Sequence, residues 1–206
     1  MGDAKRLGMG EEMTDKPDEL LRFFSRAERL ERLPRTGWLV AGVQHPESVA
    51  AHGYEVALVA LWLADNVDAE IDAEKVLRIA LLHDIGEALL TDLPRPVKDF
   101  VGEEDVADAE ARAREVVLGD VGPGWSEDAE SYREQRTAEA RIVKAADRIQ
   151  MLAKSLVYDS QHRGDVERFW EGIEDAGDYG FPLVGRIFDR LEEHWNSGEW
   201  YANDLD

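Results

Sequence analysis

The chain has 206 residues, of which 44% are hydrophobic, and this is enough for one domain with a substantial core. Its net charge of −21 disfavours DNA or RNA binding, because phosphate contacts need clustered Lys and Arg and no such cluster occurs. The absence of cysteine excludes disulfides, thiolate metal ligands and cysteine nucleophiles.

Residues 1–16 mix glycine, methionine and charge without a period, which predicts a mobile N-terminal tail. They contain no apolar run of the kind found in secretory signals, and no later run has the length of a bilayer span, so a cytoplasmic location is expected. From Pro17 the spacing becomes helical, with apolar positions at Leu20, Phe23, Phe24, Ala27 and Leu30. Residues 33–42 carry a proline and two glycines and predict a loop.

Two long helices are expected next. The first begins near Pro46, because proline suits a first helical turn. One face of it would carry Val49, His52, Val56, Val59 and Leu63. The second begins after Asp72, a suitable N-cap, and continues to about Leu90. It is apolar nearly all round, which predicts the central buried helix.

The second half of the chain adds three helices separated by breaks. Two prolines at 91–98 prevent the preceding helix from continuing. Residues 103–118 form an acidic amphipathic pattern, and the glycine-rich segment 119–124 is a break. Apolar periodicity then predicts helices over 138–158 and 183–196.

The predicted fold is therefore all-α, a single domain of about six or seven helices over residues 17–200, followed by a short tail at 201–206. No alternating pattern typical of a strand is longer than four residues. The acidic excess, with 6 Lys against 18 Arg, resembles that of proteins from salt-loving organisms, whose carboxylate repulsion is screened by salt.

Three of the predicted helices carry a metal-competent side chain on a face that should be buried. The side chains are His52, the doublet His83 and Asp84, and Asp147. A bare carboxylate on such a face is costly unless it is paired, protonated or bound to a cation. Two imidazoles and two carboxylates form a suitable ligand set for a transition metal, with room left for water and substrate.

Each of these residues alone also has a structural interpretation. A histidine on an apolar face is commonly a hydrogen-bonded core residue. Asp84 would cap a helix or pair with Arg78, and Asp147 would pair with Lys144 or Arg148. One divalent cation satisfies all four side chains at once, so a single metal site is predicted. Mixed nitrogen and oxygen ligands favour Mn, Co, Ni, Fe or Zn over Mg.

The ordered set of ligands resembles the HD-domain metal-dependent phosphohydrolases, and within them the 5'-deoxynucleotidases of the bacterial YfbR type and the eukaryotic HD-domain-containing protein 2 type. The matching stretches are PRTGW (34–38), VQHPESVAAH (43–52), HDIGEALLTDLPRPVK (83–98) and AEARIVKAAD (138–147). The resemblance implies a helical homodimer with one divalent metal ion. It would hydrolyse deoxyribonucleoside 5'-monophosphates to deoxynucleoside and phosphate.

The resemblance also implies roles for individual residues. The metal ligands would be His52, His83, Asp84 and Asp147. Glu87 and Asp92 match positions used around the attacking water and the phosphate, and Glu87 follows His83 by about one helical turn. Their structural alternatives are a partner for His83 and a turn residue before Pro94.

Three further residues are candidates for substrate binding. Trp38 matches a tryptophan near the sugar, where it would disfavour ribose; its alternative is a core aromatic that anchors the loop. Arg35 and Lys98 are candidates for the phosphate. The region after about Tyr158 carries no recognisable chemistry and indicates packing or an interface.

Two other functions remain open from the sequence. The first is another HD-type phosphohydrolase, acting on nucleoside triphosphates, cyclic nucleotides or alarmones; for a triphosphate we expect additional basic residues at the pocket. The second is a non-catalytic nucleotide-binding regulator that retains the metal site. Intact Glu87 and Asp92 argue against the regulator, because a binding module needs neither.

Overall fold

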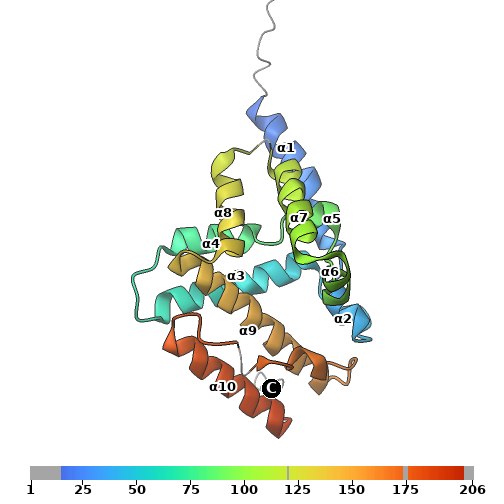
Figure 1. Cartoon of the computed structure of the whole chain (residues 1–206), viewed down its shortest axis with the longest axis vertical. Helices are drawn as coiled ribbons and strands as arrows, with labels where there is room; N and C mark the ends of the chain where they lie inside the picture. The colour runs from blue at the N-terminus through green and yellow to red at the C-terminus, as the bar shows by residue number, and fades with distance from the viewer. Residues whose placement is uncertain (1–14, 120, 174–175, 202–206) are drawn as a thin grey trace, which may run out of the picture.

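The computed structural model describes residues 15–119, 121–173 and 176–201, and these residues form a helical domain (Figure 1). The predicted tails lie outside the described residues, apart from Asp15, Lys16 and Tyr201. The α-helices are α1 (Lys16–Ala27), α2 (Thr36–Val40), α3 (Val49–Asn66), α4 (Ala73–Leu82), α5 (Glu87–Leu90), α6 (Arg95–Val101), α7 (Glu103–Leu118), α8 (Pro123–Glu134), α9 (Ala138–Ser160) and α10 (Pro182–Ser197), with short 3₁₀ helices at Glu28–Glu31 and Glu167–Phe169. None of these helices combines the length and apolar composition needed to cross a lipid bilayer.

Helix α9 lies at the centre of the domain and contacts α3, α4, α8 and α10 (Figure 1). Its buried face carries Ile142, Val143, Ala146, Leu152 and Leu156, which pack into the largest apolar cluster of the described residues. The central buried helix is thus α9. The prediction that residues 72–90 take this place is wrong, because α4 leaves Leu81 on its outer side 61% exposed.

The segment predicted as one helix from Asp72 to Leu90 is broken in the middle. Asp72 caps α4 as expected, since its side chain accepts a hydrogen bond from the Lys75 N–H. The helix then ends at Leu82, because the His83 imidazole bonds to the Ala80 carbonyl at 2.7 Å, an oxygen that the next turn would otherwise use. A tight turn therefore follows, and the His83–Asp84 doublet lies in that turn and not within a helix.

The expected number of six or seven helices is wrong for the described residues, which contain α1 to α10. Segments expected to be non-helical contain α2 and most of α6, and the latter begins with proline in its first turn. Helix α8 was not expected. Its signal is the spacing of Trp125, Ala129 and Tyr132, which places all three on one face against α4 and α9.

One isolated antiparallel bridge joins Pro34 to Ser48 within the described residues. Beside it, the Arg35 N–H donates to the Glu47 carbonyl at 3.0 Å, and the Val49 N–H donates to the Leu33 carbonyl at 2.8 Å. The bridge fixes the start of α2 against the start of α3. It therefore brings Arg35 to the same end of the domain as the buried face of α3.

The loop after α9 contacts the loop after α2 at Gly164, which has a positive φ of 80°. A Cβ atom there would lie 2.6 Å from the Ala41 carbonyl oxygen and 2.7 Å from the Val43 side chain. We expect Gly164→Ala to lower the free energy of unfolding by about 2–4 kcal/mol, from backbone strain and overpacking together. Urea denaturation measures this loss.

Gly172→Ala is the matched control for this substitution. Gly172 also has a positive φ, of 71°, but nothing lies within 4 Å of an added Cβ atom. It therefore reports the backbone strain alone, which costs about 1–2 kcal/mol. Equal losses in the two variants would show that the contact between the two loops is not tight.

Candidate metal centre and active site

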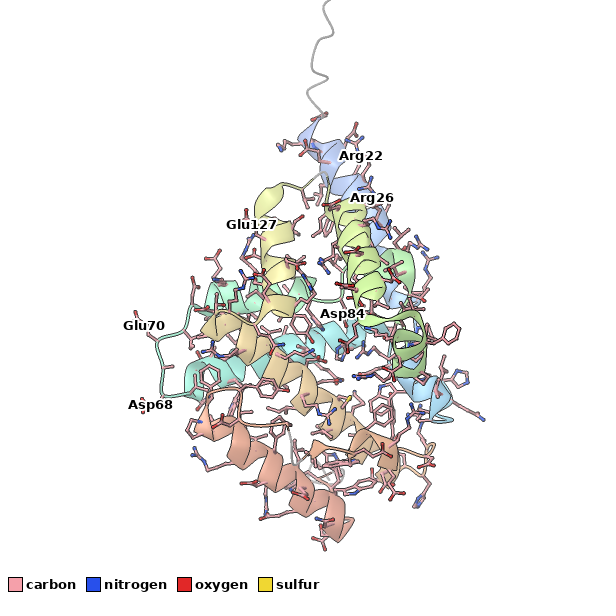
Figure 2. All side chains as sticks on the ribbon, viewed as in Figure 1. Arg22, Arg26, Asp68, Glu70, Asp84 and Glu127 are labelled. Atoms are coloured by element: carbon pink, nitrogen blue, oxygen red, sulfur yellow. The ribbon has the colours of Figure 1, made fainter. Side chains whose placement is uncertain are left out.

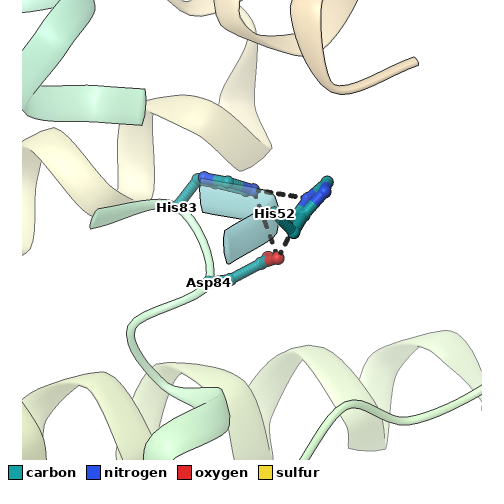
Figure 3. Close-up of side chains that lie close together, drawn as sticks. All are labelled: His52, His83 and Asp84. Carbon is teal, nitrogen blue, oxygen red and sulfur yellow. Dashed lines mark hydrogen bonds and ion pairs between the residues drawn. The ribbon is translucent and has the colours of Figure 1, made fainter. Parts of the chain in front are cut away.

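Three of the four side chains predicted as ligands, His52, His83 and Asp84, come together at one end of the buried core, and the fourth, Asp147, contacts His52. His52 comes from α3, His83 and Asp84 from the turn after α4, and Asp147 from α9. Figure 3 shows the first three pointing toward one another. The His52 and His83 Nε2 atoms lie 3.4 Å apart, and Asp84 Oδ2 lies 3.6 Å from the first and 3.2 Å from the second. Asp147 Oδ1 lies 3.3 Å from His52 Nε2.

These distances fit a shared cation. Ligand atoms about 2.1 Å from one ion lie roughly 3.0–3.5 Å apart when they are neighbours in its coordination shell. The Nδ1 atom of each imidazole makes a different hydrogen bond. His52 Nδ1 bonds to the Gln150 side chain at 2.8 Å, and His83 Nδ1 bonds to the Ala80 carbonyl at 2.7 Å. Their Nε2 lone pairs consequently face each other and the carboxylates, an arrangement that a divalent cation stabilises.

The charges at this cluster are strongly coupled. Although burial opposes ionisation, the His83 imidazole and its hydrogen bond hold the pKa of Asp84 well below its ordinary value. Asp147 is affected in the same way, because its bond to His52 and the charge of Lys144 lower its pKa against the effect of burial. Figure 2 shows that Asp84 lies inside the domain, whereas Asp68, Glu70 and Glu127 lie at the surface.

A tyrosine and a lysine hold the Asp147 carboxylate. The Tyr132 hydroxyl of α8 donates to Asp147 Oδ2, and the Lys144 ammonium donates to the Tyr132 oxygen at 2.7 Å. Lys144 Nζ also lies 3.6 Å from Asp147 Oδ2, so the structural pairing expected for Asp147 coexists with its place at the centre. The pairing expected for Asp84 is wrong, since Arg78 bonds instead to Asp128 at 2.6 Å.

Arg35 lies beside the four ligands, surrounded by carboxylates. Its Nη1 atom is 3.2 Å from Asp84, 3.4 Å from Asp92 and 3.8 Å from Glu87. Burial lowers the pKa of this guanidinium, but the three negative charges raise it above its ordinary value. A permanently charged group with several N–H donors is therefore held at the mouth of the cluster.

Glu87 begins α5, one tight turn beyond the doublet. Burial, followed by the charges of Asp84 and Asp92, raises the pKa of Glu87 to about 10. Its Oε2 atom is buried and has no hydrogen-bond partner within the protein. An unpartnered buried oxygen beside a cation site is suited to bind a water molecule or a substrate oxygen.

Asp92 follows α5 and contacts the start of α2. Its Oδ2 atom accepts from the Thr36 N–H at 2.6 Å, and its carbonyl accepts from the Thr36 hydroxyl at 2.7 Å. The carboxylate thus satisfies an otherwise free donor at a helix N-terminus while it also contacts Arg35. Asp92 is thus a turn residue, as the structural alternative from the sequence had it, and its carboxylate also positions Arg35.

A cavity of about 310 Å³ opens onto the cluster. Its wall includes Lys98, which donates to Glu110 at 3.1 Å. It is lined by residues of the loops and helices from α2 to α9, namely Arg35, His83, Asp84, Gly86, Glu87, Lys98, Glu110, Arg114, Ala129, Tyr132, Arg133, Gln135, Lys144 and Asp147. Such a volume suits a small phosphorylated molecule.

Trp38 is buried, with 3% of its surface exposed. Its ring packs against Tyr158 and Phe169, with centroids 5.2 and 4.2 Å away. It is therefore a core aromatic, which was the structural alternative, but it also lines a second cavity of about 40 Å³ together with Arg35, Asp92 and Gln150. Trp38 is consequently near the candidate site without facing the larger cavity.

A family model described as the HD domain matches residues 27–175, and the four candidate ligands lie within that match. The chain belongs to the HD-domain family. This HD-domain chain is 30% identical over 178 residues to the human protein named 5'-deoxynucleotidase HDDC2, with 84% of each chain covered. It is 32% identical over 186 residues to the Dictyostelium discoideum protein of the same name, covering 84% of this chain and 96% of that one.

A solved structure has a similar fold. A conserved hypothetical protein from Pyrococcus furiosus has a TM-score of 0.74 and 37% identity to this HD-domain chain, with 84% of this chain and 99% of the other covered. The family predicted from the ordered ligands, the HD-domain phosphohydrolases, is confirmed. His52, His83 and Asp84 form its candidate metal site.

Several polar residues around the HD-domain centre were not expected from the sequence, chiefly Tyr132, Gln150 and Glu47. Gln150 bonds to His52, and Glu47 bonds to Gln150 at 2.9 Å. Gln150 carried a usable signal, because it follows Asp147 by three positions and is polar on an otherwise apolar helix face. For Tyr132 the signal was its helical spacing with Trp125 and Ala129, which was not used because α8 itself was not expected.

Proposed function

We propose that this HD-domain phosphohydrolase is a 5'-deoxynucleotidase that releases phosphate from deoxyribonucleoside 5'-monophosphates. The observation that carries the proposal is the cavity of about 310 Å³, whose wall combines His83 and Asp84 of the candidate metal site with Arg35 and Glu87. The names of the human and Dictyostelium relatives support the same substrate class. A divalent ion, once bound there, supplies Lewis acidity toward a phosphoryl oxygen and lowers the pKa of water.

The protein side chains have the following proposed roles. His52, His83, Asp84 and Asp147 hold the ion, for which Mn, Co, Ni, Fe or Zn is favoured over Mg by the nitrogen ligands. The positive charge of a bound ion would lower the raised pKa of Glu87, so that its carboxylate can accept a proton from the attacking water. The water oxygen bonds to phosphorus as the bond to the 5'-oxygen breaks, and the 5'-oxygen takes up that proton.

The cationic side chains stabilise the charge on the transferring phosphoryl group. Arg35 lies closest to the ligands, where its donors can bind equatorial oxygens. Asp92 holds Arg35 and the start of α2, and Lys98 extends the positive wall of the cavity. Trp38, which lines the smaller cavity together with Arg35, lies on the side of the site proposed for the sugar.

The proposal predicts metal-dependent phosphate release. After chelator treatment, the protein should be inactive toward dAMP, dCMP and dTMP, and adding back single divalent ions should restore activity by about 1,000-fold or more, the several kcal/mol that such an ion contributes. Phosphate release is measured for each ion, with AMP as the ribose control. No release with any ion would end the nucleotidase proposal.

A triphosphate substrate is the principal rival. The cavity wall contains more basic residues than the sequence indicated, yet they are paired with acids. Lys98 contacts Glu110, and Arg114 and Arg133 both contact Glu130. These carboxylates lower the positive potential that a triphosphate needs. Appearance of pyrophosphate or tripolyphosphate from dATP, in place of phosphate from dAMP, would favour the rival.

A homodimer is part of the same proposal. Exposed apolar side chains on one face of α3 support it, with Tyr54 64% and Leu58 and Trp62 each 51% exposed. Leu81 of α4 borders the same surface across a cavity of about 350 Å³ that Tyr54 also lines. A ridge beside a hollow on one face suits a two-fold interface.

We expect Leu58→Glu with Trp62→Glu to weaken dimerisation at least about 100-fold, because like charges would then face each other across the two-fold axis. Sedimentation equilibrium measures the change. Val116→Glu on α7, where the valine is 54% exposed, is the control and should leave association unchanged. A wild-type chain that sediments as a monomer would contradict the proposal.

A further inference from the structure

The ring of His52 is held on the side opposite the candidate metal centre. His52 has no exposed surface, and its Nδ1 atom lies 2.8 Å from the side-chain oxygen of Gln150 on α9. Gln150 is 3% exposed, so neither group can exchange this bond for one to bulk water. The two side chains therefore depend on each other for a hydrogen-bond partner.

Two carboxylates fix the orientation of the Gln150 amide. Its Nε2 atom donates to Glu47 Oε2 at 2.9 Å and to Glu55 Oε2 at 2.8 Å. Reversing the amide would turn its oxygen toward both carboxylates and its NH₂ toward the imidazole. The His52 Nδ1–H must therefore donate a hydrogen bond to Gln150 Oε1, which leaves the Nε2 lone pair free for a cation.

Glu47 continues the network to the tryptophan. Its Oε1 atom accepts from the Trp38 indole N–H at 2.9 Å, so its two oxygens bond separately to Trp38 and Gln150. Lys154 balances the buried charge, with Nζ 3.5 Å from Glu47 and 2.6 Å from Glu55. The Glu47 N–H also donates to the Tyr158 hydroxyl oxygen at 2.9 Å.

We propose that Gln150 and Glu47 are positioning residues that hold His52 in its Nδ1–H tautomer and link the metal centre to Trp38, so that metal affinity and sugar discrimination depend on one buried network. The part of this proposal that concerns metal affinity depends only on the hydrogen bonding of His52. The sugar part rests on the proposed nucleotidase function. The network joins the two through three consecutive hydrogen bonds, from His52 to Gln150, Glu47 and Trp38.

The first test uses Gln150→Leu, which keeps the approximate size of the side chain and removes all three of its bonds. Divalent-cation affinity should fall by about 10–100-fold, as measured by competition with a chelator. In the metal-stripped full chain at alkaline pH, ¹H–¹⁵N correlation spectra should show His52 as the Nδ1–H tautomer in the wild type. The variant should populate the Nε2–H form as well.

Gln161→Leu makes the same change at the exposed end of α9 and is the control. It should alter neither affinity nor tautomer. Gln150→Leu and Gln150→Met both leave polar groups buried without this partner, so both are measured, and circular dichroism establishes which variants are folded. A folded variant that keeps the wild-type tautomer and affinity would overturn the role of Gln150.

The second test uses Glu47→Gln, which retains an acceptor for one of Trp38 and Gln150 but not for both. We expect about a 10-fold or larger loss in the ratio of kcat/KM for dAMP over AMP, together with weaker cation binding. An unchanged ratio with weakened cation binding would overturn the link to Trp38. If no variant, including the wild type, hydrolyses any monophosphate, the proposed function fails, while the tautomer and affinity still decide the metal part.

Discussion

Replacing His83 with alanine is expected to abolish cation binding and hydrolysis together. The imidazole Nε2 atom lies 3.4 Å from His52 Nε2 and 3.2 Å from Asp84 Oδ2, so its removal deletes one ligand and leaves the others unpaired. Loss of the ion removes several kcal/mol of transition-state stabilisation, a fall in kcat/KM of about 1,000-fold or more. Elemental analysis and phosphate release, measured on the same preparation, check both effects.

His194→Ala is the matched control, because His194 is a half-buried residue of α10 that bonds to Glu199 and Tyr201 and not to the cluster. It should retain the ion and the activity. A His83→Ala variant that hydrolyses dAMP at the wild-type rate with no bound ion would refute a metal-dependent reaction. Retention of a full complement of metal would refute His83 as a ligand.

Replacing Glu87 with glutamine is expected to separate catalysis from metal binding. Its Oε2 atom is buried without a partner at the edge of the cluster, where it can bind the attacking water. Glutamine keeps the size but cannot accept the proton, so kcat should fall by about 100- to 10,000-fold. Cation affinity should stay within a few-fold of the wild type, since Glu87 is not one of the four proposed ligands.

Glu127→Gln provides the comparison for Glu87→Gln, because Glu127 lies at the surface of α8 (Figure 2). Its activity should equal that of the wild type. Equal losses of kcat and of cation affinity in Glu87→Gln would assign Glu87 to the ligand set instead. An unchanged kcat would support the non-catalytic regulator considered from the sequence.

The sequence predicted the helical class and a candidate metal site that contains His52, His83 and Asp84 for a simple reason. His52 and Asp147 lie on the apolar faces of long helices, and a polar side chain on such a face must meet a partner inside the domain. The order of these residues along the chain then indicated a known family by resemblance. Helix boundaries were less predictable, as the break at His83 depends on one side chain bonding to the Ala80 carbonyl.

Arg35 illustrates what local pattern cannot supply. From the sequence it was one of several candidates for the phosphate, whereas the structure places it among Asp84, Glu87 and Asp92. That position results from the bridge between Pro34 and Ser48 and from the Asp92 bonds to Thr36, which join segments 14 and 56 residues apart. Pairings over such separations leave no period in the sequence.

The sequence by itself thus determined which side chains are costly to bury and therefore had to share a partner, and with them the helical class and the family. Only the tertiary structure decided which groups hold those side chains: Gln150 for His52, Tyr132 for Asp147, and Asp92 for Arg35. The physical reason is that burial follows from the apolar periodicity of each helix alone. A hydrogen-bond partner is chosen by the packing of different helices against one another.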